Sequence, residues 1–580
     1  MAAQSPARDL VIIALPGVQR QISEARSTAD VRAGSEIVTS LVTVAAGSLQ
    51  AQGGELVIPG GIGDPDGLPN RVVALAPPGS GASFATGAAS AVHDKWQDLL
   101  RKVFEPIRSA PTPGMPKVQW VCVPDDGRGY GWQWARAQAL LTARRRVRDF
   151  EPQEWPQRAI CTLSPRWPAE DIPPPNLQNH EQATLSATNW VKRRWQRIQG
   201  GDRFPSTLSI ASAPFRRQVL MLAANEGIGD EINAAITALH KEAHTVGGSG
   251  EARVPGLLTG SNPGAQWFSR SGGPWVYPER WQPRTLARDT GRDVGELHDV
   301  AQAGRTALDR LLKVADKHGV HRPTDYLAIV VQDLDGMGRF LSGEGVNAAN
   351  VTLAVDPGEH RRISGLLGRL AAGQRTALHR ADLLGVPVYV GGDDLLAFAP
   401  ATTALAAAQA CHDLIPPELP TASTAVLFFH YQAGLQAALT RARELLDTAK
   451  ESVSGKHALA VGYLRRSGVR ECSIQPWSGT NGQSSAAMFQ VFGRDVAHPL
   501  SPRLVGDLER DTDELAALHR RDQELYRAEL TRLVGRHLGG EKAGRAQAAT
   551  EVAATLLELG AGQKLAGAAR VGVFLRQEAR

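Results

Sequence analysis

Two adjacent carboxylates form the clearest chemical motif in this sequence. Gly391-Gly392-Asp393-Asp394 lies between two apolar runs, 386–390 and 394–400, whose composition is typical of β-strands. A glycine turn joins two strands tightly and presents the aspartates at the tip of a hairpin. Paired carboxylates on a rigid hairpin suit Mg²⁺ or Mn²⁺, which take oxygen ligands and share their coordination shell with substrate phosphates. Taken alone, the same four residues could be a hydrophilic turn without a chemical role.

A second acidic segment strengthens the case for chemistry. Asp333-Leu334-Asp335 stands at the end of an apolar strand-like run, 325–333, about 60 residues upstream of the hairpin. In a palm fold the first strand and the central hairpin are neighbours, so Asp333 is expected to reach Asp393 and Asp394, with Asp335 as a further candidate ligand. Carboxylates around one or two metal ions are what in-line phosphoryl transfer needs, because the metals neutralise a triphosphate and activate the attacking hydroxyl.

Other residues around these carboxylates suit a nucleotide triphosphate. Gly336 and Gly338 leave room for phosphates at the start of a helix, where free N–H groups favour anions. Lys450 stands near the end of the helical segment 431–452, and Lys456 stands in the turn before the next strand, so both could reach a triphosphate. The alternative for each lysine is a solvated charge at a helix end.

The elements that must position these residues form a repeated pattern. Within 1–160 the order is β-α-β-β-α-β, which is typical of a ferredoxin-like palm. The expected strands are 9–16, 55–60, 70–77 and 117–124, with one long helix or two at 18–47 and a helix at 87–107. Residues 321–472 repeat this logic around the acidic hairpin, with expected strands at 325–333, 386–390, 394–400 and 457–466 and helices at 359–384 and 431–452.

The sequence therefore predicts an α+β chain of two palm domains interleaved with two mainly helical domains. The expected domains are a first, degenerate palm at 1–160, a mainly helical domain at 161–320, a second palm at 321–472 and a linker with helices at 473–580. Linkers are expected at 173–175 and 246–285, and a loose segment at 473–502, because these stretches are rich in Pro, Gly or Ser.

Composition limits the function classes. With 42% hydrophobic and 21% charged residues over 580 positions, the chain is globular rather than disordered, and its net charge of +5 is weak support for a nucleic-acid partner. Four cysteines exclude a disulfide scaffold. No apolar run approaches the roughly 20 residues that span a bilayer. We therefore expect a cytoplasmic protein with no membrane partner.

Several segments together resemble the large subunit of type III-B (Cmr-type) CRISPR–Cas effector complexes. The second palm carries the resemblance in YLAIVVQDLDGMGRFLSGEG (326–345), EHRRISGLLGRL (359–370), VYVGGDDLLAFAP (388–400) and GKHALAVGYLRRSG (455–468). LPGVQRQISEARSTADVRAGSEIVTSL (15–41) is similar to the opening of that family, and FPSTLSIASAPFRRQVL (204–220) to its helical second domain. More distantly, the hairpin and the Ala-Lys-(x)4-Gly-Lys pattern resemble diguanylate cyclases.

The resemblance implies a function. Such a subunit scaffolds a complex guided by CRISPR RNA and, when target RNA pairs with the guide, polymerises ATP into cyclic oligoadenylates in antiviral defence. Carried over by motif, Asp333, Asp393 and Asp394 would be catalytic and hold the metals, Gly391 and Gly392 would let the nucleotide approach, and Gly336, Lys450 and Lys456 would contact it. The expected partners are other Cmr-type subunits, with a small helical subunit at the C-terminal helices, together with guide and target RNA.

The first palm differs from the second, and the sequence departs from the family pattern at two places. The first palm has Leu15-Pro16-Gly17 where the second has its acidic strand end, so it would at most hold an acceptor ATP. The first strand begins near Asp9, so we expect no His-Asp metal nuclease domain and no DNase activity from one. Where relatives carry Cys-x-x-Cys, this chain has Cys161 and Ser164, so no zinc is expected.

Two alternatives to the cyclic-oligoadenylate synthase stay open. The chain could be an idle scaffold that keeps the GGDD hairpin but serves assembly and RNA binding. The intact carboxylate set favours the synthase over this alternative. It could be a freestanding nucleotidyl cyclase, but such an enzyme needs neither a duplicated palm nor a long helical C-terminus. Basic clusters near tryptophans, 144–148 and 192–194, are candidates for RNA contacts or for solvated helix faces.

Overall fold

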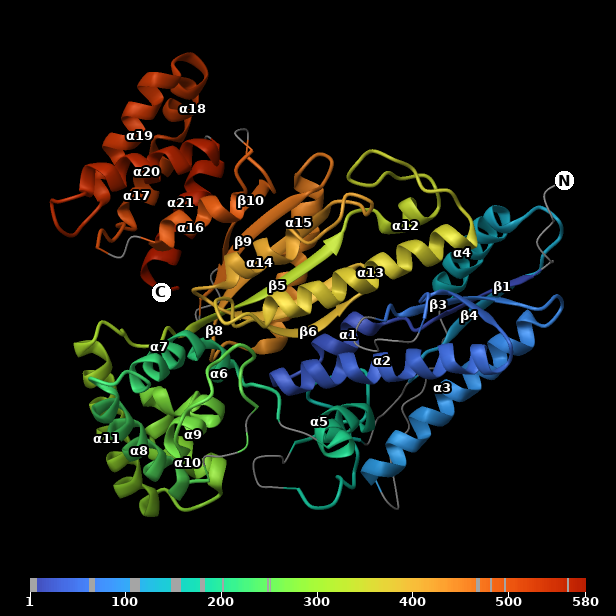
Figure 1. Cartoon of the computed structure of the whole chain (residues 1–580), viewed down its shortest axis with the longest axis horizontal. Coiled ribbons are helices and arrows are strands. Elements are labelled where there is room, and N and C mark those ends of the chain that lie inside the picture. Colours follow the sequence, from blue (N-terminus) through green and yellow to red (C-terminus); the bar gives the residue numbers. More distant parts are fainter. Residues whose placement is uncertain are drawn as a thin grey trace.

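A computed structural model describes most of the chain in four blocks (Figure 1). The described residues are 8–61, 68–104, 115–147, 158–177, 183–200, 203–247, 250, 252–465, 470–479, 482–494, 497–560 and 563–579. The blue and the yellow-to-orange segments each contain a sheet, and the green and the red segments are helical (Figure 1). Two sheets with separate helical blocks confirm the predicted α+β class.

The first palm is a four-stranded antiparallel sheet in the order β2-β3-β1-β4. This order and the connections give the ferredoxin-like topology that the pattern predicted. The segment 18–47, expected as one long helix or two, is two helices, because Ser27 begins the second one by a capping box with Asp30. The elements are β1 (Asp9–Ala14), α1 (Val18–Ser23), α2 (Thr28–Ala51), β2 (Glu55–Ile58), β3 (Arg71–Ala76), α3 (Gly81–Phe104), β4 (Gln119–Val123) and α4 (Tyr130–Arg146).

The second palm is a six-stranded sheet in the order β10-β9-β8-β5-β7-β6. Strands β8, β5, β7 and β6 reproduce the order of the first palm, and the α15–β9 unit adds a strand parallel to β8. The elements are β5 (Tyr326–Leu334), α12 (Met337–Leu341), α13 (Pro357–Leu378), β6 (Val386–Gly391), β7 (Asp394–Pro400), α14 (Ala404–His412), β8 (Ala422–His430), α15 (Leu435–Ser452), β9 (Ala458–Leu464) and β10 (Arg470–Pro476).

The structure corrects two expectations about this sheet. The sequence pattern missed β8, although its residues are almost all buried at the centre of the sheet, because a short continuous apolar run has no periodicity of its own. The segment expected to be loose, 473–502, contains the second half of β10 and a helix, α16 (Ser485–Arg494). Strand β10 therefore continues beyond residue 472.

The helical material divides differently from the expectation. Helix α5 (Ala187–Gln199) packs against α2 and α3 of the first palm, whereas the later helices form a block that shares a hydrophobic core with the sheet of the second palm. The stretch 246–285, expected as a linker, is part of that block, because Trp267, Phe268 and Trp281 are buried in its core. The block contains α6 (Thr207–Ala211), α7 (Ala213–Ala223), α8 (Gly229–Thr245), α9 (Pro263–Ser271), α10 (Pro283–Thr290), α11 (His298–Lys317) and the 3₁₀ turns at Pro274–Val276, Pro278–Trp281 and Gly295–Leu297.

The C-terminal helices share a core with the second palm. Phe574 stacks on Tyr463 of β9 with ring centroids 4.4 Å apart, so the last helix is fixed to the sheet. The helices are α17 (Arg503–Arg510), α18 (Thr512–Arg521), α19 (Gln523–His537), α20 (Arg545–Glu558) and α21 (Gln563–Gln577). Across the described residues, no helix has the length and apolarity needed to cross a membrane.

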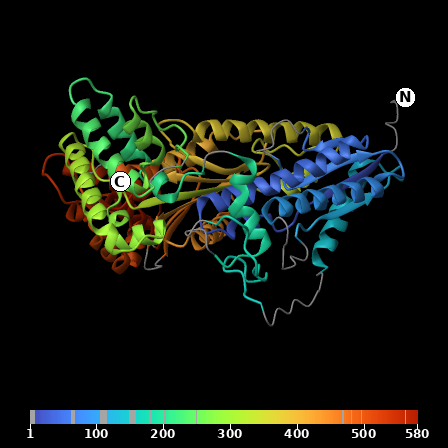
Figure 2. The same cartoon turned by 90° about the horizontal axis from the view of Figure 1, so that it is seen from below.

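The two palms face each other with reciprocal contacts. Helix α2 of the first palm lies against β6 of the second, and α13 of the second lies against β2 of the first. Arg32 on α2 donates to the Val388 carbonyl at 3.0 Å, and Arg361 on α13 donates to the Leu56 carbonyl at 2.9 Å. Figure 2 shows the long yellow helix of the second palm above the long blue helices of the first palm. The acidic hairpin therefore lies at a palm–palm boundary.

Candidate active site

Strand register brings the sequence-predicted carboxylates together. Asp333 on β5 lies directly opposite Asp394 on β7, and Gly391 pairs with Asp394 at the closed end of the β6–β7 hairpin. The Leu334 N–H donates to the Asp393 carbonyl at 3.0 Å, which fixes the turn to the end of β5. The hairpin thus presents Asp393 and Asp394 beside Asp333, as the palm pattern requires.

These carboxylates repel one another. Burial and the nearby Asp333 carboxylate raise the pKa of Asp393. Burial and a hydrogen bond with Asp333 raise the pKa of Asp394 well above its usual range. Lys450 on α15 forms an ion pair with Asp333 and partly offsets the charge. The cluster is therefore an anionic donor set whose charge Lys450 offsets only in part.

The donor set fits a hard divalent cation better than it fits a structural turn. Like charges directly opposite each other destabilise a strand pair, and Mg²⁺ prefers carboxylate oxygens together with substrate phosphates and water. Within the described part of the chain, however, no three acidic, histidine or cysteine side chains already form a metal-binding group. A cation here would therefore share its ligands with a bound nucleotide, and Asp333, Asp393 and Asp394 would be the protein's contribution.

Asp335 has different surroundings from the other three carboxylates. It accepts hydrogen bonds from the Ser423 hydroxyl at 2.9 Å, the Thr421 hydroxyl at 3.2 Å and the His457 N–H at 2.9 Å. Burial raises its pKa despite these bonds. Asp335 therefore holds the turn before β9 to the start of β8, a positioning role that the sequence did not indicate.

The remaining residues that the sequence predicts as nucleotide contacts differ in their surroundings. Gly336 has φ 71° and begins α12, and a side chain at Gly338 would meet nothing within 4 Å, so this end of β5 is open. Gly392 has φ 64° and faces Pro69 of the first palm at 3.4 Å from an added Cβ. Lys450 lies at the carboxylates, whereas Lys456 is exposed in a left-handed turn.

A cavity of about 420 Å³ opens between the two palms beside the acidic hairpin. Asp393 and Gly392 line it from the second palm, and Asn70 and Arg71 line it from the start of β3 in the first palm. Helix α13 supplies a further wall, which includes Arg361. Its volume lies in the range of small-molecule sites, so a nucleotide could lie here with its phosphates toward Asp393.

Sequence reasoning missed two arginines that flank the carboxylates. Arg71 interacts electrostatically with Asp393, and Arg443 on α15 does so with Asp394 while donating to the Gln19 carbonyl of the first palm at 2.6 Å. Arg443 stands seven residues before Lys450, so both share one helix face, and that spacing was the available signal. For Arg71 the signal was its place at the start of a palm strand.

The register also shows which positions correspond in the two palms. Ala14 lies opposite Arg71 as Asp333 lies opposite Asp394. The Leu15 N–H donates to the Asn70 carbonyl at 3.1 Å, as Leu334 does to Asp393. By this register Ala14, Leu15, Gly17, Asn70 and Arg71 of the first palm correspond to Asp333, Leu334, Gly336, Asp393 and Asp394 of the second. The first palm therefore has no carboxylate at any of these positions.

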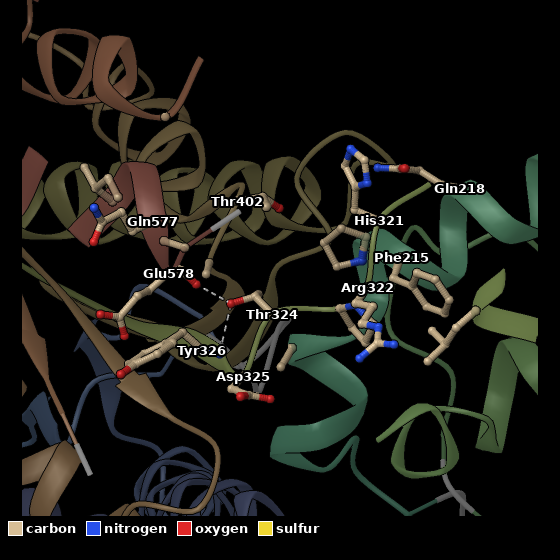
Figure 3. A pocket seen from close by; sticks show the side chains of 18 of the residues that line it. Phe215, Gln218, His321, Arg322, Thr324, Asp325, Tyr326, Thr402, Gln577 and Glu578 are labelled. Carbon is tan, nitrogen blue, oxygen red and sulfur yellow. Dashed lines mark hydrogen bonds between the residues drawn. The ribbon is translucent and has the colours of Figure 1, made fainter. Parts of the chain in front are cut away.

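A larger cavity, of about 1590 Å³, lies at the opposite end of β5. Figure 3 shows its lining near Thr324, Tyr326 and Glu578, where the Thr324 hydroxyl donates to the Glu578 carbonyl. The lining carries charges of both signs from three blocks of the chain, including Arg322 and Asp325. It does not include any of the predicted site residues, so the smaller inter-palm cavity is the candidate active site.

The basic and cysteine motifs have largely structural surroundings. Lys192 is buried and donates to the Gln21 and Glu24 carbonyls, which corrects the expectation that this cluster faces solvent or RNA. Arg145 and Arg146 are exposed at the end of α4, and Arg148 lies outside the described residues. All four cysteines are free, and the amide of Asn189 donates to the Cys161 sulfur at 3.3 Å.

Comparisons with known proteins agree with this geometry. Residues 326–460 match the family described as Cas10/Cmr2, second palm domain. The CRISPR system Cmr subunit Cmr2 of Pyrococcus furiosus is 29% identical over 181 residues, a match that covers 27% of this chain and 21% of that protein. The match therefore spans about a fifth of the length of that curated relative.

Two solved structures share the fold over most of the chain. The type III-B Cmr-beta structure in the apo state matches with a TM-score of 0.58 and 13% identity, covering 93% of this chain and 78% of that one. Cmr-beta bound to cognate target RNA matches with a TM-score of 0.59 and 14% identity, covering 92% and 79%. These likenesses extend the agreement in fold well beyond the second palm.

Two palm sheets, one of which ends in clustered carboxylates, define a nucleotidyl-cyclase-like palm protein. Within that class, residues 326–460 match the second palm domain of the Cas10/Cmr2 family, and the chain as a whole shares the fold of the Cmr-beta chains.

Proposed function

We propose that this protein is the large subunit of a type III-B complex guided by CRISPR RNA, and that it converts ATP into cyclic oligoadenylates when target RNA binds. The observation that carries the proposal is the register pairing of Asp333 with Asp394 beside a cavity that both palms enclose. A hairpin that served only as a turn would not need opposed carboxylates with raised pKa values.

The reaction fits the groups at the site. A ribose hydroxyl oxygen attacks the α-phosphorus of a second ATP, its bond to phosphorus forms, and the bond to the departing pyrophosphate breaks while the hydroxyl proton passes to water. A bound Mg²⁺ or Mn²⁺ would supply charge neutralisation and lower the pKa of the hydroxyl. Asp333, Asp393 and Asp394 would hold that cation, and Lys450 and Arg443 lie close enough to add positive charge as phosphates arrive.

A product assay tests this function. The complex is assembled with guide RNA, given matching target RNA, Mg²⁺ and ATP, and its products are analysed by mass spectrometry beside an Asp393→Ala/Asp394→Ala variant. We expect cyclic oligoadenylate that depends on target RNA and is absent from the variant. A wild-type complex that binds target RNA but makes no product would contradict the proposal.

One observation favours a second candidate, an idle scaffold. Lys450 already neutralises Asp333, and the described residues contain no ready-made group of three metal ligands. In a scaffold this ion pair would persist when Mg²⁺ and ATP are added. An assembled complex with target-dependent conformational change but no nucleotide turnover would support this candidate over the enzyme.

We further propose that a small helical subunit of the complex docks on the C-terminal helices. These helices cannot simply be deleted, because α21 shares the palm core through Phe574. Leu525 on α19 is instead 54% exposed, which suits an apolar contact. Leu525→Asp is expected to reduce recovery of the small subunit in size-exclusion chromatography, whereas Gln523→Asp on the same helix should leave it unchanged. Equal recovery with both variants would exclude docking through this face.

A further inference from the structure

Arg71 occupies the first-palm position that corresponds to the carboxylate of Asp394. The cross-strand pair of Ala14 and Arg71 corresponds to the pair of Asp333 and Asp394. It carries one positive charge where the second palm has two carboxylates. We propose that Arg71 is a substrate-binding residue that holds the triphosphate of the nucleotide in the inter-palm cavity. The inference rests on the proposed function and assigns part of the substrate contact to the palm that lacks the carboxylates.

The two palms bring Arg71 to the acidic hairpin. Arg71 and Asp393 line the same cavity, and the electrostatic interaction between them is favourable. Pro69, two residues before Arg71, lies against the turn at Gly392. A triphosphate beside Asp393 would therefore have the first palm's Arg71 as a neighbour.

The Arg71 guanidinium has more N–H donors than its hydrogen bond to Gln138 uses. Among the described residues, its hydrogen-bond acceptor is neutral, the side-chain oxygen of Gln138 on α4 at 3.2 Å. Among the residues that the structure describes, no carboxylate lies within ion-pair distance of it. A guanidinium carries five N–H donors and keeps its charge in proteins, so several donors remain for a ligand.

The charge balance of the cavity points to a phosphate ligand. Burial and the like charge of Arg145 lower the pKa of Arg71, and the carboxylate of Asp393 opposes this shift. Lys450 is paired with Asp333, so the positive charge that it offers a triphosphate is already partly offset. Phosphate oxygens match the planar guanidinium fork, and this pairing is stronger than a bond between neutral groups. The simpler alternative is that Arg71 only offsets the negative charge of Asp393. This alternative predicts that replacing Arg71 leaves the affinity for phosphates unchanged.

Binding measurements with the full chain separate these roles. Isothermal titration calorimetry with Mg²⁺ compares a non-hydrolysable ATP analogue, α,β-methylene-ATP, with adenosine, which lacks phosphates. Arg71→Gln should weaken binding of the analogue about ten- to a hundredfold while changing adenosine binding less than about twofold. Arg71→Lys should fall between, because it keeps the charge and loses the fork. Arg136→Gln, an equal charge change at an exposed position of α4, is the matched control and should change neither.

The outcomes distinguish this inference from the proposed function. If the wild-type chain binds the analogue and Arg71→Gln binds it equally well, Arg71 has no phosphate role and the inference is wrong. Equal weakening of the analogue and of adenosine would also overturn it, because Arg71 would then only shape the cavity. If the wild-type chain binds neither ligand even in the assembled complex with target RNA, the proposed function itself fails.

Discussion

The two palms share topology and register but differ in charge at one end of the sheet. At corresponding positions the first palm has Ala14 and Arg71, and the second has Asp333 and Asp394. The backbone is nearly repeated, since Gly17 and Gly336 both have positive φ values before the following helix. The fold thus fixes where side chains meet, and the residue types at these paired positions give opposed carboxylates to the second palm alone.

The second palm also has an addition that the first lacks. Helix α15 and β9 extend the sheet beyond β8, and this unit brings Lys450 and Arg443 to the carboxylates. The first palm contributes Arg71 from its own strand instead. The comparison therefore predicts that the carboxylates are indispensable, that the added cations assist, and that the palm–palm contacts mainly stabilise.

The strongest test gives the second palm the residues of the first. Asp333→Ala/Asp394→Arg should lower the rate of cyclic oligoadenylate formation at least about a thousandfold, because several kcal/mol of charge stabilisation are lost. Product is measured by mass spectrometry in the assembled complex. Glu344→Arg, at an exposed loop of the same palm, is the control and should keep full activity. Substantial activity in the double variant would mean that these carboxylates are not the catalytic set.

The added α15 unit is tested at Lys450. Lys450→Met should reduce the rate about ten- to a hundredfold, because it removes a charged partner of Asp333 near the phosphates. Lys456→Met in the neighbouring exposed turn should change the rate less than about threefold. Steady-state product formation at saturating ATP gives both values. An equal loss in both variants would support the expectation that Lys456 also contacts the triphosphate.

The sequence was sufficient for the part of the site that lies within one supersecondary unit. The glycine hairpin and the strand end at Asp333 predicted a cross-strand pair, and the structure brings them into register. Local spacing did not predict the hydrogen bonds that Asp335 accepts from Thr421 and Ser423, because these residues stand at the start of β8, the strand that the apolar pattern missed. Local spacing predicts neighbours only where the intervening elements are recognised.

The palm–palm contacts could not be predicted for a different physical reason. Arg71 and Asp393 are more than 300 residues apart and meet only because one palm packs on the other. Similarly, the stretch 246–285 has a composition typical of linkers, yet Trp267 and Trp281 find buried surroundings there. Such contacts depend on tertiary packing, which residue type and periodicity do not encode locally.

The charge difference between the palms should also affect stability. The folded pKa of Asp394 lies well above the unfolded value near 3.9, so ionisation destabilises the fold as pH rises through the folded pKa. Asp394→Asn should therefore increase the free energy of unfolding by about 1–2 kcal/mol at pH 8 without divalent metal. The difference in the free energy of unfolding between this variant and the wild type should disappear below about pH 4, where Asp394 is protonated in both the folded and the unfolded state. Urea unfolding at the two pH values measures it.

The control for this stability test is Asp413→Asn, which removes a largely exposed carboxylate from the same palm. That variant should show no comparable gain at pH 8. Added Mg²⁺ should raise the stability of the wild type and not that of Asp394→Asn, since a ligand that binds only the folded state shifts unfolding by mass action. If Asp394→Asn is no more stable at pH 8, the opposed carboxylates are not under electrostatic strain.

The smallest expected effects concern the reciprocal arginines. Arg32→Met removes the hydrogen bond to the Val388 carbonyl and an ion pair with Glu36 on the same helix, and Arg361→Met removes the hydrogen bond to the Leu56 carbonyl and an ion pair with Glu55 of the first palm. Each variant should lower the free energy of unfolding by about 0.5–1.5 kcal/mol, because a partly exposed ion pair adds little to the hydrogen bond. Equal losses would show that the contacts are equivalent in energy as well as in position. Arg361 also lines the cavity, whereas Arg32 is not part of its lining. Arg361→Met should therefore weaken binding of α,β-methylene-ATP as well, and equal binding by the two variants would limit both arginines to holding the palms together.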